Sequence, residues 1–128
     1  GVRRLSLANP EAVPAGKYSR AWLVKMGQWD AIRERVVPAV DVRATLAAVE
    51  SGLIEAGVVY ATDAMISKRV RVLYEVPEED APNIAYSFAM LRNRPHPDEV
   101  RKMAVCLTSA QAMKAFGNRG FIVKAPKP

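Results

Sequence analysis

The stretch that decides the fold runs from Val36 to Ala64 and reads VVPAVDVRATLAAVESGLIEAGVVYATDA. Its middle is rich in alanine, the residue that favours helix most. Asp41 stands where a helix N-cap is expected, and Gly52 stands where that helix should end. Short apolar segments, 36–37 and 55–60, flank the helix and are expected to be strands. A strand, a helix and a second strand in this order indicate two parallel strands of one sheet.

The same alternation begins earlier in the chain. Leu5–Ala8 is expected to be a buried strand, and residues 16–26 an amphipathic helix that ends at Gly27. Residues 28–35 predict a short helical turn before the strand at 36–37. Alternating strands and helices predict an α/β fold with a mostly parallel sheet flanked by helices.

Beyond Tyr60 the pattern predicts shorter elements. They are a helix over 63–67 capped by Thr62 or Asp63, a strand over Val70–Val76, an exposed loop over 77–83, a long apolar strand over Ile84–Leu91, a helix beginning at Pro97, a last helix capped at 108–109 and closed by Gly117, and a final strand over 120–123.

Composition narrows the possible functions. The 128 residues carry a formal net charge of +6, with one cysteine and one histidine. Cys106 lies among apolar residues and is expected to be a buried thiol, and His96 lies in a turn between prolines, so neither Cys/His catalysis nor a zinc site is predicted. The basic residues are scattered and no aromatic residues interleave with them, which argues against nucleic-acid binding. No apolar run reaches about 18 residues, the length that spans a membrane.

No group of acidic residues suggests catalysis either. The sequence contains no nucleotide-binding glycine motif, and we expect the protein not to be an enzyme. The carboxylates considered as catalytic pairs are Asp30, Glu34, Glu50, Glu55 and Asp63.

Three positions follow successive strands and therefore belong to one edge of the predicted sheet, where ligands of such folds bind. Ala15 and Val42 offer main-chain N–H groups at helix starts, and Tyr60 offers a hydroxyl. These donors, without an acceptor among them, suit a fully deprotonated oxyanion. Pro14, Gly16 and Asp41 are expected to support them, by shaping or capping the helix starts. Taken singly, each position also fits a plain loop-to-helix turn, an ordinary helix residue or a packed aromatic ring.

The segments LANPEAVPAGKYSRAWLVKMGQWDAI (7–32), the stretch from Val36 to Ala64, and FGNRGFIVK (116–124) resemble the periplasmic molybdate-binding proteins of ABC importers. The resemblance implies the periplasmic-binding-protein fold, in which two lobes close on molybdate or tungstate held by amides and hydroxyls, with no directly bound metal ion and no other cofactor. The positions that match family ligands are Ala15, Val42 and Tyr60.

The resemblance also implies a division of the chain. Residues 1–84 would form most of the second, oxyanion-binding lobe. Residues 85–128, a crossover strand and two helices, would complete the first lobe. The family's remaining ligands lie in an N-terminal segment that nothing here resembles. We therefore expect weak binding by this chain alone, or association with that segment or with a second copy.

Two functions follow from the resemblance. The first is the substrate-binding component of an ABC transporter, located in the periplasm or otherwise outside the cytoplasm and working with a membrane permease. The second is an oxyanion-sensing effector domain of a regulatory protein.

Overall fold

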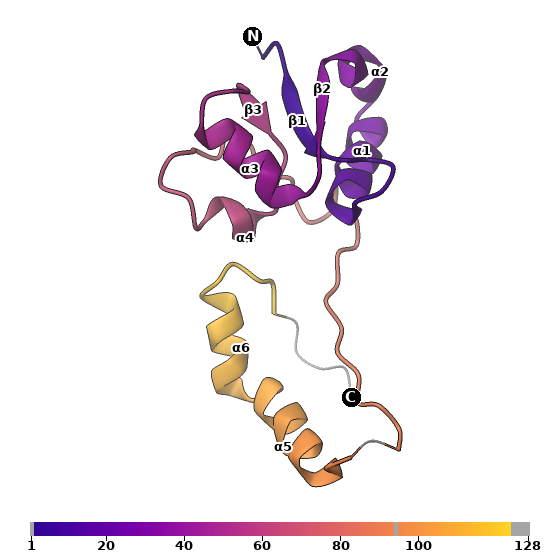
Figure 1. Cartoon of the computed structure of the whole chain (residues 1–128), viewed down its shortest axis with the longest axis vertical. Helices are drawn as coiled ribbons and strands as arrows, with labels where there is room; N and C mark the ends of the chain where they lie inside the picture. The colour runs from indigo at the N-terminus through magenta and orange to yellow at the C-terminus, as the bar shows by residue number, and fades with distance from the viewer. Residues whose placement is uncertain (1, 94, 124–128) are drawn as a thin grey trace. The chain divides into compact units, whose positions relative to one another are not determined.

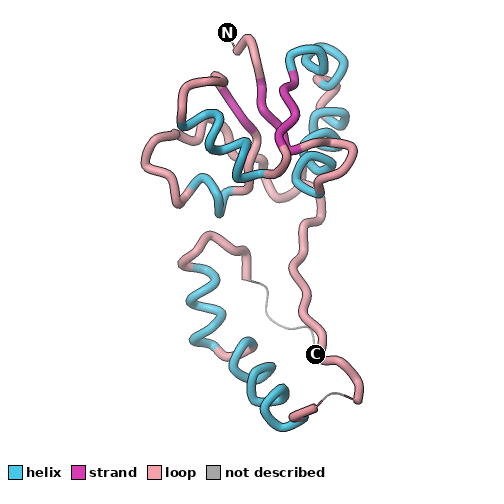
Figure 2. Tube along the Cα trace, in the orientation of Figure 1, coloured by secondary structure: helices cyan, strands magenta, loops and turns pink. Residues whose placement is uncertain are grey.

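The computed structural model describes residues 2–93 and 95–123 and divides the chain into two compact units, residues 1–84 and 85–128. The first unit contains a three-stranded sheet with helices around it, and the second contains two helices joined by a short turn (Figure 1, Figure 2). The predicted α/β fold is confirmed.

The sheet is parallel and has the order β2-β1-β3, with β1 (Leu5–Ala8) in the centre. β2 (Val36–Ala39) pairs with β1 in the register Leu5↔Val36 to Ala8↔Ala39. β3 is only Ala56–Gly57 and pairs with the beginning of β1. Because all three strands are parallel, their carboxyl ends point to the same edge of the sheet.

Two helices pack against the central strand and form the core with it. These are α1 (Pro14–Lys25), which follows β1, and α3 (Val42–Glu50), which follows β2. Leu7 of β1 is fully buried, and Leu23 of α1 and Leu46 of α3 are almost completely buried. Two short elements, α2 (Trp29–Ile32) and the 3-10 helix η1 (Arg33–Arg35), connect α1 to β2.

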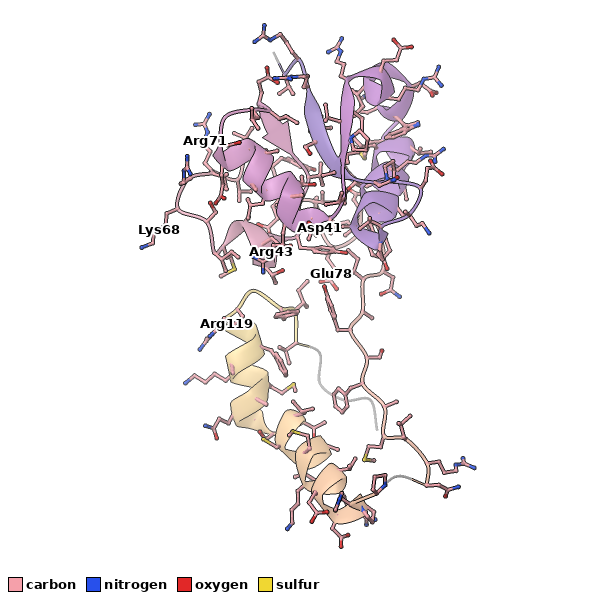
Figure 3. All side chains as sticks on the ribbon, viewed as in Figure 1. Asp41, Arg43, Lys68, Arg71, Glu78 and Arg119 are labelled. Atoms are coloured by element: carbon pink, nitrogen blue, oxygen red, sulfur yellow. The ribbon has the colours of Figure 1, made fainter. Side chains whose placement is uncertain are left out.

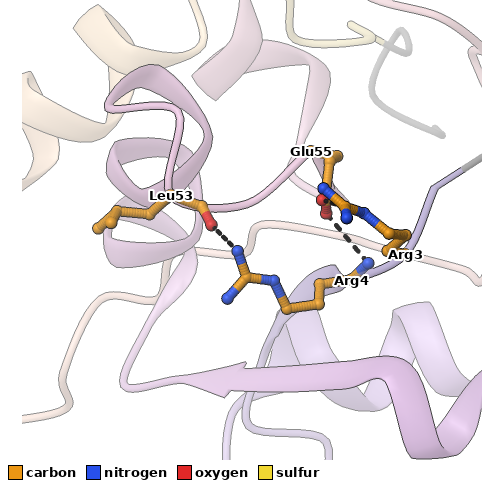
Figure 4. A network of polar contacts seen from close by, with 4 residues as sticks. All are labelled: Arg3, Arg4, Leu53 and Glu55. Atoms are coloured by element: carbon orange, nitrogen blue, oxygen red, sulfur yellow. Dashed lines mark hydrogen bonds and ion pairs between the residues drawn. The ribbon is translucent and has the colours of Figure 1, made fainter.

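Contacts between the chain before β1 and the chain before β3 hold the amino-terminal end of the sheet together (Figure 4). The main-chain N–H of Arg4 donates to Glu55 Oε2 at 3.0 Å, and the Arg4 guanidinium donates to the carbonyl of Leu53. Arg3 Nε lies 3.4 Å from Glu55 Oε1. The hydrogen bond from its own N–H, the one from the N–H of Arg4 and the charges of Arg3 and Arg4 hold the pKa of Glu55 below its ordinary value.

The helix after β3 differs from the prediction. α4 spans Ala61–Ala64, and its N-cap is Tyr60, whose carbonyl accepts from the N–H groups of Asp63 at 3.0 Å and Ala64 at 3.1 Å. Thr62 and Asp63 lie inside the helix, so the predicted caps are wrong. The expected strand over 55–60 is also shorter than predicted, because β3 is only Ala56–Gly57, although the N–H of Val58 still donates to the carbonyl of Ser6 at 3.1 Å.

The predicted strand Val70–Val76 is wrong as well, because residues 70–84 form no strand. Instead this segment contacts the end of α1. The rings of Tyr74 and Trp22 stack with their centres 6.0 Å apart. Lys25 Nζ donates to Asp80 Oδ1 at 2.8 Å and to the carbonyl of Glu79 at 3.1 Å.

The second unit has the two predicted helices, α5 (Pro97–Leu107) and α6 (Ala110–Gly117). Ser109 caps α6 by accepting from the N–H of Ala112 at 3.2 Å. The predicted strands Ile84–Leu91 and 120–123 are wrong, because the described residues there form loop and turn and no strand. Cys106 is exposed, not buried as predicted.

Candidate functional site

The candidate site is the edge of the sheet at which the three parallel strands end. α1, α3 and α4 each begin there, after β1, β2 and β3 in turn. In Figure 1 the strand arrows of the first unit point to the side on which these helices start. The structure therefore brings Ala15, Val42 and Tyr60 to one edge, each at or beside a helix start, as the sequence predicted for that edge.

The first turn of α1 leaves two N–H groups without an acceptor inside the helix. Pro14 is the first helical residue and has no N–H. Lys17 already donates to the carbonyl of Val13 at 3.0 Å. The N–H groups of Ala15 and Gly16 remain, and both residues are buried against the sheet. No side chain caps this helix, so its N-terminus keeps the partial positive charge that favours an anion.

Gly16 explains why a glycine follows Ala15. A Cβ atom at this position would lie 2.0 Å from the main-chain oxygen of Ala8 and 2.6 Å from that of Asn9. The start of α1 therefore lies directly on the end of β1, closer than any larger residue allows.

The start of α3 is capped as predicted. Asp41 Oδ1 accepts from the N–H of Ala44 at 2.7 Å, and its carbonyl accepts from the N–H of Thr45 at 3.2 Å. These bonds use two N–H groups of the first turn and leave those of Val42 and Arg43 without an acceptor inside the helix. The Asp41 cap therefore fixes the helix start while Val42 keeps its donor.

An ion pair that the sequence analysis missed joins α3 to α4. Arg43 Nε lies 3.0 Å from Asp63 Oδ1, and the Asp63 side chain is only 8% exposed. Figure 3 shows Arg43 beside Asp41 at the start of α3. The sequence signal was present, because Arg43 follows Val42 directly and Asp63 comes three residues after Tyr60.

A shallow depression of about 360 Å³ lies beside these helix starts. The β1–α1 connection lines one side with Asn9, Ala12 and Val13, and the end of β2 lines the other with Pro38, Ala39 and Val40. Ala15, Val42 and Tyr60 do not line it, although Val13 and Val40 each precede a predicted site residue by two positions.

Among the described residues, 2–93 and 95–123, no helix is long and apolar enough to cross a membrane. No cluster of three or more histidine, cysteine, aspartate or glutamate residues in this part of the chain could hold a metal ion.

Comparison with known proteins identifies the family. A family model described as bacterial extracellular solute-binding protein matches residues 1–122. The chain belongs to this family. The molybdate-binding protein ModA of Escherichia coli is 36% identical to this chain over 121 residues. The match covers 94% of this chain and 47% of that protein. The molybdate-binding protein ModA of Haemophilus influenzae is 32% identical over 120 residues, again with 94% and 47% coverage.

A solved substrate-binding domain from Clostridium difficile superimposes with a TM-score of 0.81 at 28% identity, covering 93% of this chain and 52% of that one. This likeness supports the periplasmic-binding-protein-like fold. The chain therefore spans about half the length of the solute-binding relatives it matches.

Proposed function

We propose that this chain binds molybdate or tungstate as part of the substrate-binding component of an ABC transporter. The observation that carries the proposal is the convergence of three helix starts on one sheet edge, in a chain whose relatives include two molybdate-binding proteins. The proposed ligands are the N–H groups of Ala15 and Val42 and the hydroxyl of Tyr60. Pro14, Gly16 and Asp41 support them.

The chemistry of these groups favours a dianion without protons. Main-chain N–H groups are donors only, and helix N-termini add partial positive charge. A monohydrogen phosphate presents an O–H that needs an acceptor, and leaving this O–H unpaired costs free energy. Sulfate satisfies the same donors as molybdate, so selection between these two ions rests on the size of the cavity.

The family and the fold support a role in transport. We propose that residues 1–84 belong to the second lobe, that residues 85–128 complete the first, and that the remaining ligands come from a further segment or a second copy. In this arrangement the protein works outside the cytoplasm and delivers the oxyanion to a membrane permease.

The proposal is tested by thermal unfolding of the chain in millimolar sodium molybdate, tungstate, sulfate or phosphate at pH 7 and matched ionic strength. A ligand that binds only the folded state raises the midpoint, by the equivalent of about 2.7 kcal/mol at a hundredfold excess over Kd. We expect molybdate and tungstate to raise the midpoint most and phosphate least. Equal shifts with all four salts, or none with molybdate and tungstate, would contradict the proposal.

A further inference from the structure

Asp63 is the one charged residue among the buried side chains of the described part of the chain. A carboxylate at such a position is costly unless a partner compensates its charge. The partner is Arg43, whose own side chain is 63% exposed. An exposed arginine thus pairs with a buried carboxylate, an arrangement that carries a desolvation cost.

The ion pair lies between the starts of α3 and α4. Arg43 is the second residue of α3, next to Val42, and Asp63 lies in α4, whose N-cap is Tyr60. The ion pair therefore joins the two helix starts at which these proposed ligands lie. A second contact, from the Ser67 hydroxyl to Glu50 Oε1, joins the far end of α3 to the chain after α4.

We infer that the Arg43–Asp63 ion pair is a positioning device for oxyanion binding, which fixes the Val42 N–H and the Tyr60 side chain relative to each other. The inference rests on the proposed function and deepens it. Neither residue contacts the anion in this role. With the pair intact, both donors are already placed when the anion arrives, so less ordering is needed on binding.

The pair also offsets a competing charge. A guanidinium is a strong donor to any anion, protonated or not. Asp63 engages the Nε edge of the guanidinium beside Val42 and offsets its charge, which weakens its pull on an anion. Discrimination then depends more on the uncharged donors.

The test is a double-mutant cycle on molybdate affinity, measured by titration calorimetry on the full chain. Arg43→Met and Asp63→Asn are each expected to weaken binding roughly tenfold, and the double variant no more than either alone, because both remove one interaction. Lys25→Met and Asp80→Asn are matched controls. They make the same charge changes at an ion pair near the opposite end of α1 and should leave the affinity unchanged.

A second readout needs no ligand. In NMR spectra, Asp63→Asn should shift the Val42 amide and the Arg43 Nε–H signals, while Asp80→Asn should leave both in place. An unmoved Val42 amide, or molybdate binding that is unchanged or tighter in Asp63→Asn, overturns the inference. If the unmodified chain binds no molybdate, the proposed function fails, and the Val42 amide signal still decides whether the ion pair positions the start of α3.

Discussion

Gly16 lies directly on the main-chain oxygen of Ala8, so close that a Cβ atom at residue 16 would be 2.0 Å from that oxygen. Contacts below 3.0 Å are essentially absent for real Cβ atoms, and the atom in the way belongs to the backbone of the central strand. This contact sets how near the start of α1 can approach the end of β1. The donors of Ala15 and Gly16 are placed by it.

Replacing Gly16 with alanine should therefore destabilise the first unit. Either α1 or the end of β1 must move, and overpacking of this kind costs about 1–3 kcal/mol. Urea unfolding followed by circular dichroism measures the change. Gly117→Ala is the matched control, because a Cβ at that helix end meets nothing within 4 Å. A Gly16→Ala variant as stable as the unmodified chain would show that the close approach is not required.

Removing the cap of α3 should weaken the fold more mildly. Asp41→Ala loses the hydrogen bond from the N–H of Ala44, at a cost of about 1 kcal/mol. Asp41→Asn keeps an oxygen that can accept this bond and should lose only part of the stability. The midpoint of urea unfolding distinguishes them. If both variants unfold at the same urea concentration as the unmodified chain, the cap does not stabilise α3.

Proline at residue 42 tests one donor with little change to the helix. Val42 is the first residue of α3, where proline is favoured, and Asp41 before it is extended, as a residue before proline should be. Val42→Pro removes the N–H and should weaken molybdate binding about 10- to 100-fold, the worth of one hydrogen bond to a charged group. Calorimetric titration measures the loss.

Ala110→Pro provides the control for this variant. Ala110 is the first residue of α6, after an extended Ser109, so the same substitution there removes an N–H outside the proposed site. It should leave molybdate affinity unchanged. Equal affinities in both proline variants would exclude the Val42 N–H as a ligand.

The lowered pKa of Glu55 predicts acid sensitivity at the amino-terminal end of the sheet. The hydrogen bond from its own N–H is the largest cause of the lowered pKa. Desolvation opposes it by raising the pKa, and the hydrogen bond from Arg4 with the charges of Arg3 and Arg4 lowers the pKa further. A carboxyl with a lowered folded-state pKa contributes stability above its unfolded value near 4.5, and this is lost as pH falls through the folded pKa. Urea midpoints measured from pH 7 downward should fall more steeply for the unmodified chain than for Glu55→Gln.

Local features of the fold could be predicted from sequence because neighbouring residues determine them. Asp41 and Ser109 cap their helices as expected, and Gly27 and Gly52 have positive φ just after α1 and α3. The predicted start of the first helix, residue 16, lies two residues after the observed start at Pro14, because a proline can occupy the first helical position.

The strands were harder to predict, because a strand requires a partner that the local sequence does not identify. Val70–Val76 and Ile84–Leu91 have strand-like composition, yet the described chain supplies no pairing strand for either. Composition describes how well a side chain fits a sheet surface and does not show which strand lies next to it. The prediction of a buried Cys106 was wrong for a similar reason, because residues that are apolar neighbours in sequence do not cover its side chain.

The common sheet edge of the three candidate residues could be predicted, whereas an ion pair beside them was missed. The parallel order of strands was enough to place Ala15, Val42 and Tyr60 on one edge. The partner of Arg43 was not predicted, because Asp63 comes from another element and was interpreted as a possible cap. Which cation faces which carboxylate depends on packing between elements, not on spacing within one.

The central position of β1 has a consequence for how the chain reaches its native state. Leu5 pairs with both Val36 and Ala56, so the strand that comes first along the sequence acquires its second neighbour only after the rest of the sheet has been synthesised. Until then its apolar side chains and at least one hydrogen-bonding edge are open to other chains. Conditions that slow translation of the chain up to Ala56 should therefore promote aggregation during synthesis, even when the folded protein is stable.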